Sequence, residues 1–83
     1  MVRNRMRPIH PGEILKEEFM RPMHMSAYAL ANNLSVPTNR ITAIINEQRG
    51  VTGDTAIRLS LFYGTSIEFW MNLQKTYEIR KAE

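Results

Sequence analysis

The sequence contains no cysteine and only two histidines among its 83 residues. Without cysteine the chain has neither a disulfide framework nor a thiolate metal site. His10 and His24 lack the i, i+4 spacing of a helical zinc pair, and no glycine-rich phosphate loop or nucleophile elbow is present. The neighbouring carboxylates Glu17 and Glu18 would point to different sides of a helix. We therefore expect no catalytic residue, no metal site, no cofactor and no enzymatic activity.

Long apolar runs and alternating patterns are also missing. No stretch has the length and hydropathy of a signal peptide or a membrane span, so we expect a cytoplasmic protein with no membrane partner. No segment alternates apolar and polar residues over the length of a convincing strand. These absences favour an all-α fold.

The length and charge of the chain set further bounds. We interpret residues 1–83 as a single domain, close to the size below which one hydrophobic core no longer suffices, so a homodimer would add stability. Eleven Lys and Arg residues oppose eight Asp and Glu residues. This modest positive charge permits nucleic acid as a partner without requiring it.

The stretch from Ser26 to Asn46 reads as two short helices joined by a tight turn around Ser35. Ser26 is a good N-cap for a first helix that ends near Leu34, and a second helix starts at Pro37. Both helices have apolar residues at the three-and-four spacing of a buried face, namely Ala27, Leu30, Ala31 and Leu34 in the first, and Val36, Ile41, Ile44 and Ile45 in the second. This pattern predicts a helix-turn-helix, whose second helix enters the major groove of DNA.

The outward face of that second helix supplies the candidate DNA contacts. It consists of small, polar side chains, and with the following loop the predicted set is Thr38, Asn39, Arg40, Thr42, Ala43, Asn46, Gln48 and Arg49. An asparagine can form two hydrogen bonds with an adenine edge, and the Thr42 methyl group or Ala43 can touch a thymine methyl. Arg40 would hold the backbone or a guanine, whereas Gln48 and Arg49 would meet phosphates. Two such helices in a dimer would read half-sites about 10 base pairs apart.

The segments before this motif are a basic terminus and one helix. Residues 1–9, with arginines at positions 3, 5 and 7, are interpreted as a flexible arm that either follows phosphates or is simply solvated. A helix then opens at Pro11 and ends at Pro22. Its acidic face, at Glu13, Glu17 and Glu18, is either solvated or complementary to a basic protein.

Two helices are predicted after the motif. Gly50 is expected to take a positive backbone angle in the loop, and Thr52 caps a helix that Gly64 stops, with free amides near Thr52 and Gly53 that suit a phosphate. The last helix begins at Thr65 or Ser66, with Thr65 and Glu68 spaced as a capping box. It has more apolar residues than one internal face needs, so we interpret residues 66–80 as a dimerisation helix, the alternative being a purely internal role.

Four segments together resemble a known family: HPGEIL at 10–15, SAYALANNLSVPTNRITAIINEQRGVT at 26–52, DTAIRLSLFYGTS at 54–66 and EFWMNLQ at 68–74. They are similar to the HigA-type antitoxins, which belong to the Xre-like helix-turn-helix proteins. Ser35 departs from the glycine usual at the turn, which predicts a strained or differently shaped turn.

The resemblance implies a compact five-helix bundle with a lambda-repressor-like DNA-binding domain. It implies a bacterial homodimer that binds double-stranded operator DNA, and is then nucleoid-associated. It also implies repression of its own toxin-antitoxin operon and neutralisation of a HigB-type toxin, an mRNA-cleaving enzyme related to RelE. We place the dimer contacts on the last helix, at Ile67, Trp70, Met71 and Tyr77.

Two alternative functions are consistent with the sequence. One is a stand-alone Xre-like repressor without a toxin, which the neighbouring gene would distinguish. The other is a helical adaptor that binds only protein, and its DNA affinity would not exceed the non-specific range of about 10⁻⁴ to 10⁻⁶ M.

Overall fold

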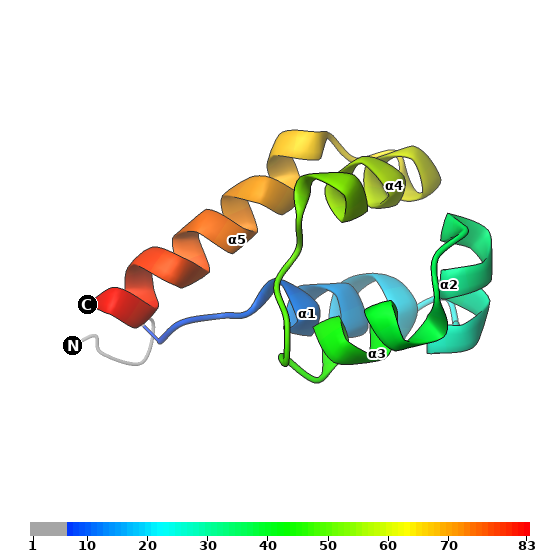
Figure 1. Ribbon diagram of the computed structural model, residues 1–83, viewed down its shortest axis with the longest axis horizontal. Helices are drawn as coiled ribbons and strands as arrows, with labels where there is room; N and C mark the ends of the chain where they lie inside the picture. Colours follow the sequence, from blue (N-terminus) through cyan, green and yellow to red (C-terminus); the bar gives the residue numbers. More distant parts are fainter. Residues whose placement is uncertain (1–6) are drawn as a thin grey trace.

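The computed structural model describes residues 7–83, which form helices joined by turns and contain no strand (Figure 1). The helical elements are α1 (Pro11–Ile14), its π-helical continuation η2 (Leu15–Met20), α2 (Ala27–Leu34), α3 (Thr38–Ile45), α4 (Gly53–Tyr63) and α5 (Ile67–Ala82). With α1 and η2 counted as one continuous helix, the described part of the chain is a five-helix fold. The predicted all-α class is confirmed.

One hydrophobic core joins all of these helices. Its fully enclosed side chains include Leu15 from η2, Leu30 from α2, Ile44 from α3, Leu59 from α4 and Trp70 from α5. Burial of each such large apolar side chain contributes about 1.5 to 3 kcal/mol relative to exposure. The apolar faces predicted for the two helices of the motif are the faces that this core covers, with Ala27, Val36 and Ile45 at its edge.

The first helix starts and ends where the sequence predicted. The imidazole Nδ1 of His10 accepts a hydrogen bond from the Gly12 amide at 2.8 Å, and Pro11 occupies the first helical position. The Arg21 amide donates to the Lys16 carbonyl at 2.9 Å, an i to i+5 bond that widens the last turns. The helix ends at Met20, just before Pro22.

Helices α2 and α3 are joined by a left-handed residue at the turn. The Ser26 hydroxyl caps α2 by accepting from the Ala29 amide at 3.0 Å, as predicted. Ser35 has φ 58° and ψ 45°, a conformation that costs an L-residue about 1–2 kcal/mol. The strain predicted from the missing glycine is therefore located at this one residue. Helix α3 is one residue shorter at each end than predicted, with Pro37 as its N-cap residue.

Two local predictions are wrong. Gly50 does not take a positive φ; the left-handed residue of the loop is Glu47, with φ 62°. Thr65 does not cap α5, because Ser66 does so by accepting from the Phe69 amide at 3.0 Å. Thr65 instead accepts a hydrogen bond from the indole Nε1 of Trp70 at 2.7 Å. Thr65 thus bonds a side chain one turn into α5, while Gly50 lies against the side chain of Gln74 on α5, a contact that a local pattern does not reveal.

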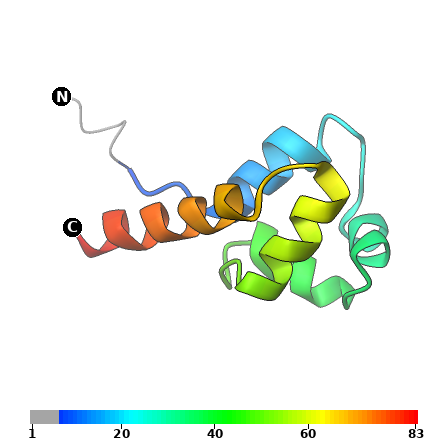
Figure 2. The same ribbon diagram turned by 90° about the horizontal axis from the view of Figure 1, so that it is seen from above.

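Helix α5 extends beyond the rest of the molecule. Its carboxyl-terminal half projects from the cluster formed by the other helices, with the segment that precedes α1 lying on the same side (Figures 1 and 2). The molecule is accordingly elongated, with extents of 41 × 23 × 22 Å. Within residues 7–83, no helix combines the length and apolar character needed to cross a bilayer.

Candidate nucleic-acid interface

The outward face of α3 is polar and accessible. Asn39 and Asn46 are exposed, whereas Thr38, Thr42 and Ala43 are half-buried. Ile41 and Ile44, on the opposite face, are completely buried and fix the rotation of the helix. The predicted contact face is thus brought together on one side of α3.

The hydrogen-bonding capacity of that face is largely unused. Within the described chain, the side-chain amides of Asn39 and Asn46 have no internal partner. The Thr42 hydroxyl donates back to the Asn39 carbonyl at 3.2 Å, which leaves its methyl group available. A free amide on an exposed helix face can form the paired hydrogen bonds that identify an adenine edge.

Arg40 has a structural partner that the sequence did not suggest. Its guanidinium lies 2.6 Å from the carboxylate of Asp54, at the start of α4, and Arg58 pairs with the same carboxylate at 3.0 Å. Hydrogen bonds from Arg58 and then Arg40 hold the pKa of Asp54 below its usual value. Arg58 also donates to the Leu34 carbonyl at 2.8 Å. This cluster ties the end of α2, the start of α3 and the start of α4 together.

The loop after α3 carries the predicted phosphate contacts on its surface. Gln48 and Arg49 are both exposed. The loop leads to Thr52, whose hydroxyl lies 3.5 Å from the Thr55 amide, a long capping bond, and Gly53 is exposed beside it. Exposed cationic and amide groups therefore follow one another between α3 and α4.

The basic arm is only partly described, because Arg3 and Arg5 lie outside residues 7–83. Arg7 is exposed and its guanidinium forms two hydrogen bonds with the Glu13 carboxylate, at 2.9 and 3.2 Å. The hydrogen bond raises the pKa of Arg7 and lowers the pKa of Glu13. Arg7 is thus engaged on α1.

The acidic face of the first helix is mostly paired within the chain. Glu17 forms an ion pair with Arg21 at 2.8 Å, as Glu13 does with Arg7. Glu18 is exposed. Of the three glutamates considered as a protein-binding face, two have their charge balanced by an arginine.

The dimer contacts predicted on α5 need one correction. Trp70 has no exposed surface within the single chain, so it belongs to the core and cannot form a contact with a second copy. Met71 and Tyr77 are half-buried, and Tyr77 packs against His10 with ring centroids 4.7 Å apart. Ile67 is 41% exposed and remains available.

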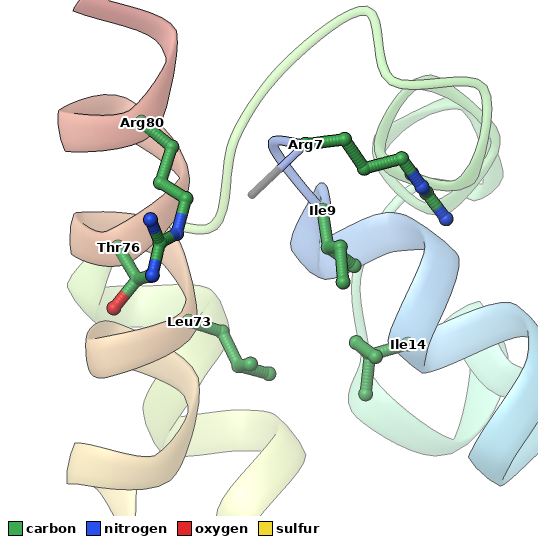
Figure 3. A pocket seen from close by; sticks show the side chains of 6 residues that line it. All are labelled: Arg7, Ile9, Ile14, Leu73, Thr76 and Arg80. Carbon is green, nitrogen blue, oxygen red and sulfur yellow. The ribbon is translucent and has the colours of Figure 1, made fainter. Parts of the chain in front are cut away.

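A cavity of about 270 Å³ lies between α5 and the segment before α1 (Figure 3). Ile9, Ile14 and Leu73 point into it from its two sides, while the guanidinium groups of Arg7 and Arg80 do not converge. The cavity therefore has an apolar lining, and Arg7 and Arg80 do not form an anion-binding site in it. Over residues 7–83, no group of three His, Cys, Asp or Glu side chains is placed to hold a metal ion.

Sequence reasoning missed two residues that shape this interface, namely Arg58 and Gln74. His10 was predicted to open the first helix together with Pro11, but its packing against Tyr77 was not predicted. The spacing of Asp54 and Arg58, i to i+4 on one helix, was the available signal for Arg58. Gln74 carries no local signal, because its partner is 23 residues away in the sequence.

Two short helices crossing at a left-handed turn, the second with a polar outward face, define a helix-turn-helix protein. No protein-family model matches the sequence. The chain is 38% identical to antitoxin HigA-1 of Vibrio cholerae over 80 residues, which are 95% of this chain and 74% of that relative.

Two solved structures are also similar. An addiction module antidote protein of the HigA family from Coxiella burnetii is 58% identical, with a TM-score of 0.88 over 92% of this chain and 83% of that one. Pseudomonas aeruginosa antitoxin HigA, solved with the higBA promoter, is 49% identical, with a TM-score of 0.90 over 92% of this chain and 83% of that one. The chain belongs to the HigA family of antitoxins, as its motifs predicted, and it is not an enzyme.

Proposed function

We propose that this chain is a sequence-specific DNA-binding antitoxin, which represses its own toxin-antitoxin operon and neutralises a HigB-type, RelE-like toxin that cleaves mRNA. The observation that carries the DNA-binding part is the outward face of α3, where the amides of Asn39 and Asn46 are exposed and unpaired within residues 7–83. The similarity to a HigA antitoxin solved with its promoter supports the same assignment.

The DNA-bound form is a homodimer. Two copies of α3, related by a two-fold axis, would enter successive major grooves on half-sites about 10 base pairs apart. Exposed apolar side chains on α5, with Ile67 at 41% and Ile79 at 53% exposure, offer surface for the second copy. Gln48, Arg49 and the amides at Thr52 and Gly53 would meet the phosphates beside each groove.

The direct test is a fluorescence-anisotropy titration of the purified protein on the DNA upstream of its own gene, at physiological salt. Scrambled DNA of the same length is the control. An operator-specific repressor binds its own DNA about a thousandfold or more tightly than the control. Equal, weak binding to both would contradict the proposal and favour a protein-binding adaptor.

Asn39→Ala tests the assignment of the reading face. Loss of a two-hydrogen-bond contact should cost about 1 to 3 kcal/mol at one base position, with little effect on scrambled DNA. Asn72→Ala removes an exposed asparagine from α5 and is the matched control, for which no loss is expected. Equal losses for Asn39→Ala on operator and scrambled DNA would count against direct readout.

Neutralisation is tested with the product of the neighbouring gene. If that product is a small basic RNA-cleaving protein, co-expression of this chain should restore growth, and the two proteins should co-purify. Glu18→Lys then tests charge complementarity, because Glu18 is the exposed glutamate of the acidic face without an arginine partner within residues 7–83. A neighbouring gene of another kind would favour the stand-alone repressor.

A further inference from the structure

The loop between α3 and α4, residues 46–52, continues from a turn at the end of α3 and is held by a distant helix, α5. It carries the exposed side chains of Gln48 and Arg49 and ends at Thr52, the N-cap of α4. The amides of Gln48 and Arg49 donate to the Ala43 carbonyl at 2.7 and 3.3 Å, which fastens the first half of the loop to the end of α3. The second half, from Gly50 to Thr52, would lose conformational entropy on binding DNA unless another contact ordered it beforehand.

This contact comes from Gln74 on α5. Its Oε1 accepts a hydrogen bond from the buried Val51 amide at 2.8 Å, and its Nε2 donates to Glu78 at 2.8 Å. The amide group of Gln74 lies so close to the loop that a Cβ on Gly50 would sit 2.6 Å from Oε1. Gly50 is therefore needed for this close approach.

His10 fixes the start of α1, which lies beside the end of α3. The imidazole is 3% exposed and is held by the Gly12 amide on Nδ1 and by the edge of the Tyr77 ring. His10 therefore anchors the start of α1 against α5.

The start of α1 also abuts the end of α3. A Cβ on Gly12 would lie 1.9 Å from the Ile44 carbonyl oxygen, so the two backbones touch where α3 passes into the loop. The chain therefore leaves a backbone contact with α1 at Ile44 and is next held by Gln74, beside Gly50.

We propose that Gln74 is a positioning residue, which holds the loop of residues 46–52 so that the Arg49 guanidinium is directed at a DNA phosphate. This inference rests on the proposed function, since the phosphate contact of Arg49 is part of it. Gln74 itself uses both ends of its amide within the protein. Its effect on DNA binding would therefore be transmitted through the loop.

Gln74→Met tests the proposal, because methionine keeps the length of the side chain and removes the acceptor for the Val51 amide. Glu78→Ala is the matched control, since it removes the other partner of Gln74 and leaves the bond to Val51. Hydrogen exchange at the Val51 amide should accelerate in Gln74→Met and stay unchanged in Glu78→Ala. Gly50→Ala, whose Cβ displaces the Gln74 amide, is a second variant with the same expected effect.

The effect on DNA is measured as a double-mutant cycle with Arg49→Ala. Gln74→Met alone should weaken binding about three- to tenfold, on operator and scrambled DNA alike, as expected for one lost hydrogen bond that orders a phosphate contact. In the Arg49→Ala background the same change should cost less than twofold. In the Asn39→Ala background Gln74→Met should keep its full effect, because Asn39 lies on α3, outside the loop, and the two changes should act independently.

The outcomes separate this inference from the proposed function. Suppose that Gln74→Met accelerates hydrogen exchange at Val51 but weakens DNA binding equally in the wild-type and the Arg49→Ala backgrounds. That result would show a general structural role and overturn the positioning role. The positioning role would also be overturned if Gln74→Met caused no loss of DNA affinity while Arg49→Ala still weakened binding. If Arg49→Ala has no effect, or if the wild-type protein does not prefer its operator, the proposed DNA interface itself is wrong.

Discussion

Ser35→Gly should stabilise the protein, because Ser35 occupies a left-handed backbone conformation at the turn of the helix-turn-helix. Its φ of 58° and ψ of 45° cost an L-residue about 1–2 kcal/mol. Glycine adopts these angles without that cost but loses about 0.4 to 1 kcal/mol more conformational free energy on folding. With the middle value of each range, the difference predicts a net gain of about 0.8 kcal/mol in the free energy of unfolding.

For a domain of this size, that gain corresponds to an increase in Tm of about 2 to 8 °C. The assay is thermal unfolding followed by circular dichroism, at one protein concentration, since dimerisation makes Tm depend on concentration. Ser35→Ala is the matched control: it removes the hydroxyl but keeps the Cβ, so the strain and the Tm should persist. A Tm for Ser35→Gly at or below that of the wild type would refute the assignment of strain to this residue. An equal increase for both variants would refute it too.

Two further predictions concern buried side chains. Burial lowers the pKa of His10 below its ordinary value of 6.5, so its contribution to stability is complete above about pH 6.5 and is lost as the pH falls below it. The difference in unfolding free energy between the wild type and His10→Asn, which keeps an N-cap acceptor, should therefore shrink between pH 7.5 and 5.5 in urea titrations; a constant difference would contradict this. Trp70→Phe should lower the unfolding free energy by about 1 to 3 kcal/mol, because it removes the hydrogen bond to Thr65 and part of a buried ring. The dissociation constant of the dimer, measured by analytical ultracentrifugation, should stay unchanged. A weaker dimer at unchanged stability would place Trp70 in the interface after all.

The helix boundaries were predictable because their signals are local. Ser26 and Thr52 cap helices through amides three residues ahead, and Gly64 ends α4 in a left-handed conformation, with φ 77°. The spacing of Ile41 and Ile44 likewise determined which face of α3 is buried, and therefore which face is polar and outward. Each of these features depends on residues within one or two turns of each other.

The roles of Trp70, Arg40 and Gly50 could not be predicted in this way. An aromatic residue on an apolar terminal helix suits a core and an interface equally well, and only the packing of α5 against the other helices buries Trp70. Arg40 meets Asp54 across 14 positions of sequence, and Gly50 makes room for Gln74 on another helix. No short-range pattern encodes such pairs, because they exist only once the helices are assembled.

The sequence by itself determined the helices, the turn between α2 and α3, and the polar face of α3, since backbone capping and the 3.6-residue period act over a few residues. The tertiary structure alone decided which charged side chains are already paired, which aromatic residue is buried, and how the loop after α3 is held. Those properties arise where segments far apart in the chain meet, and the distances between such segments are set only by the packing of the whole core.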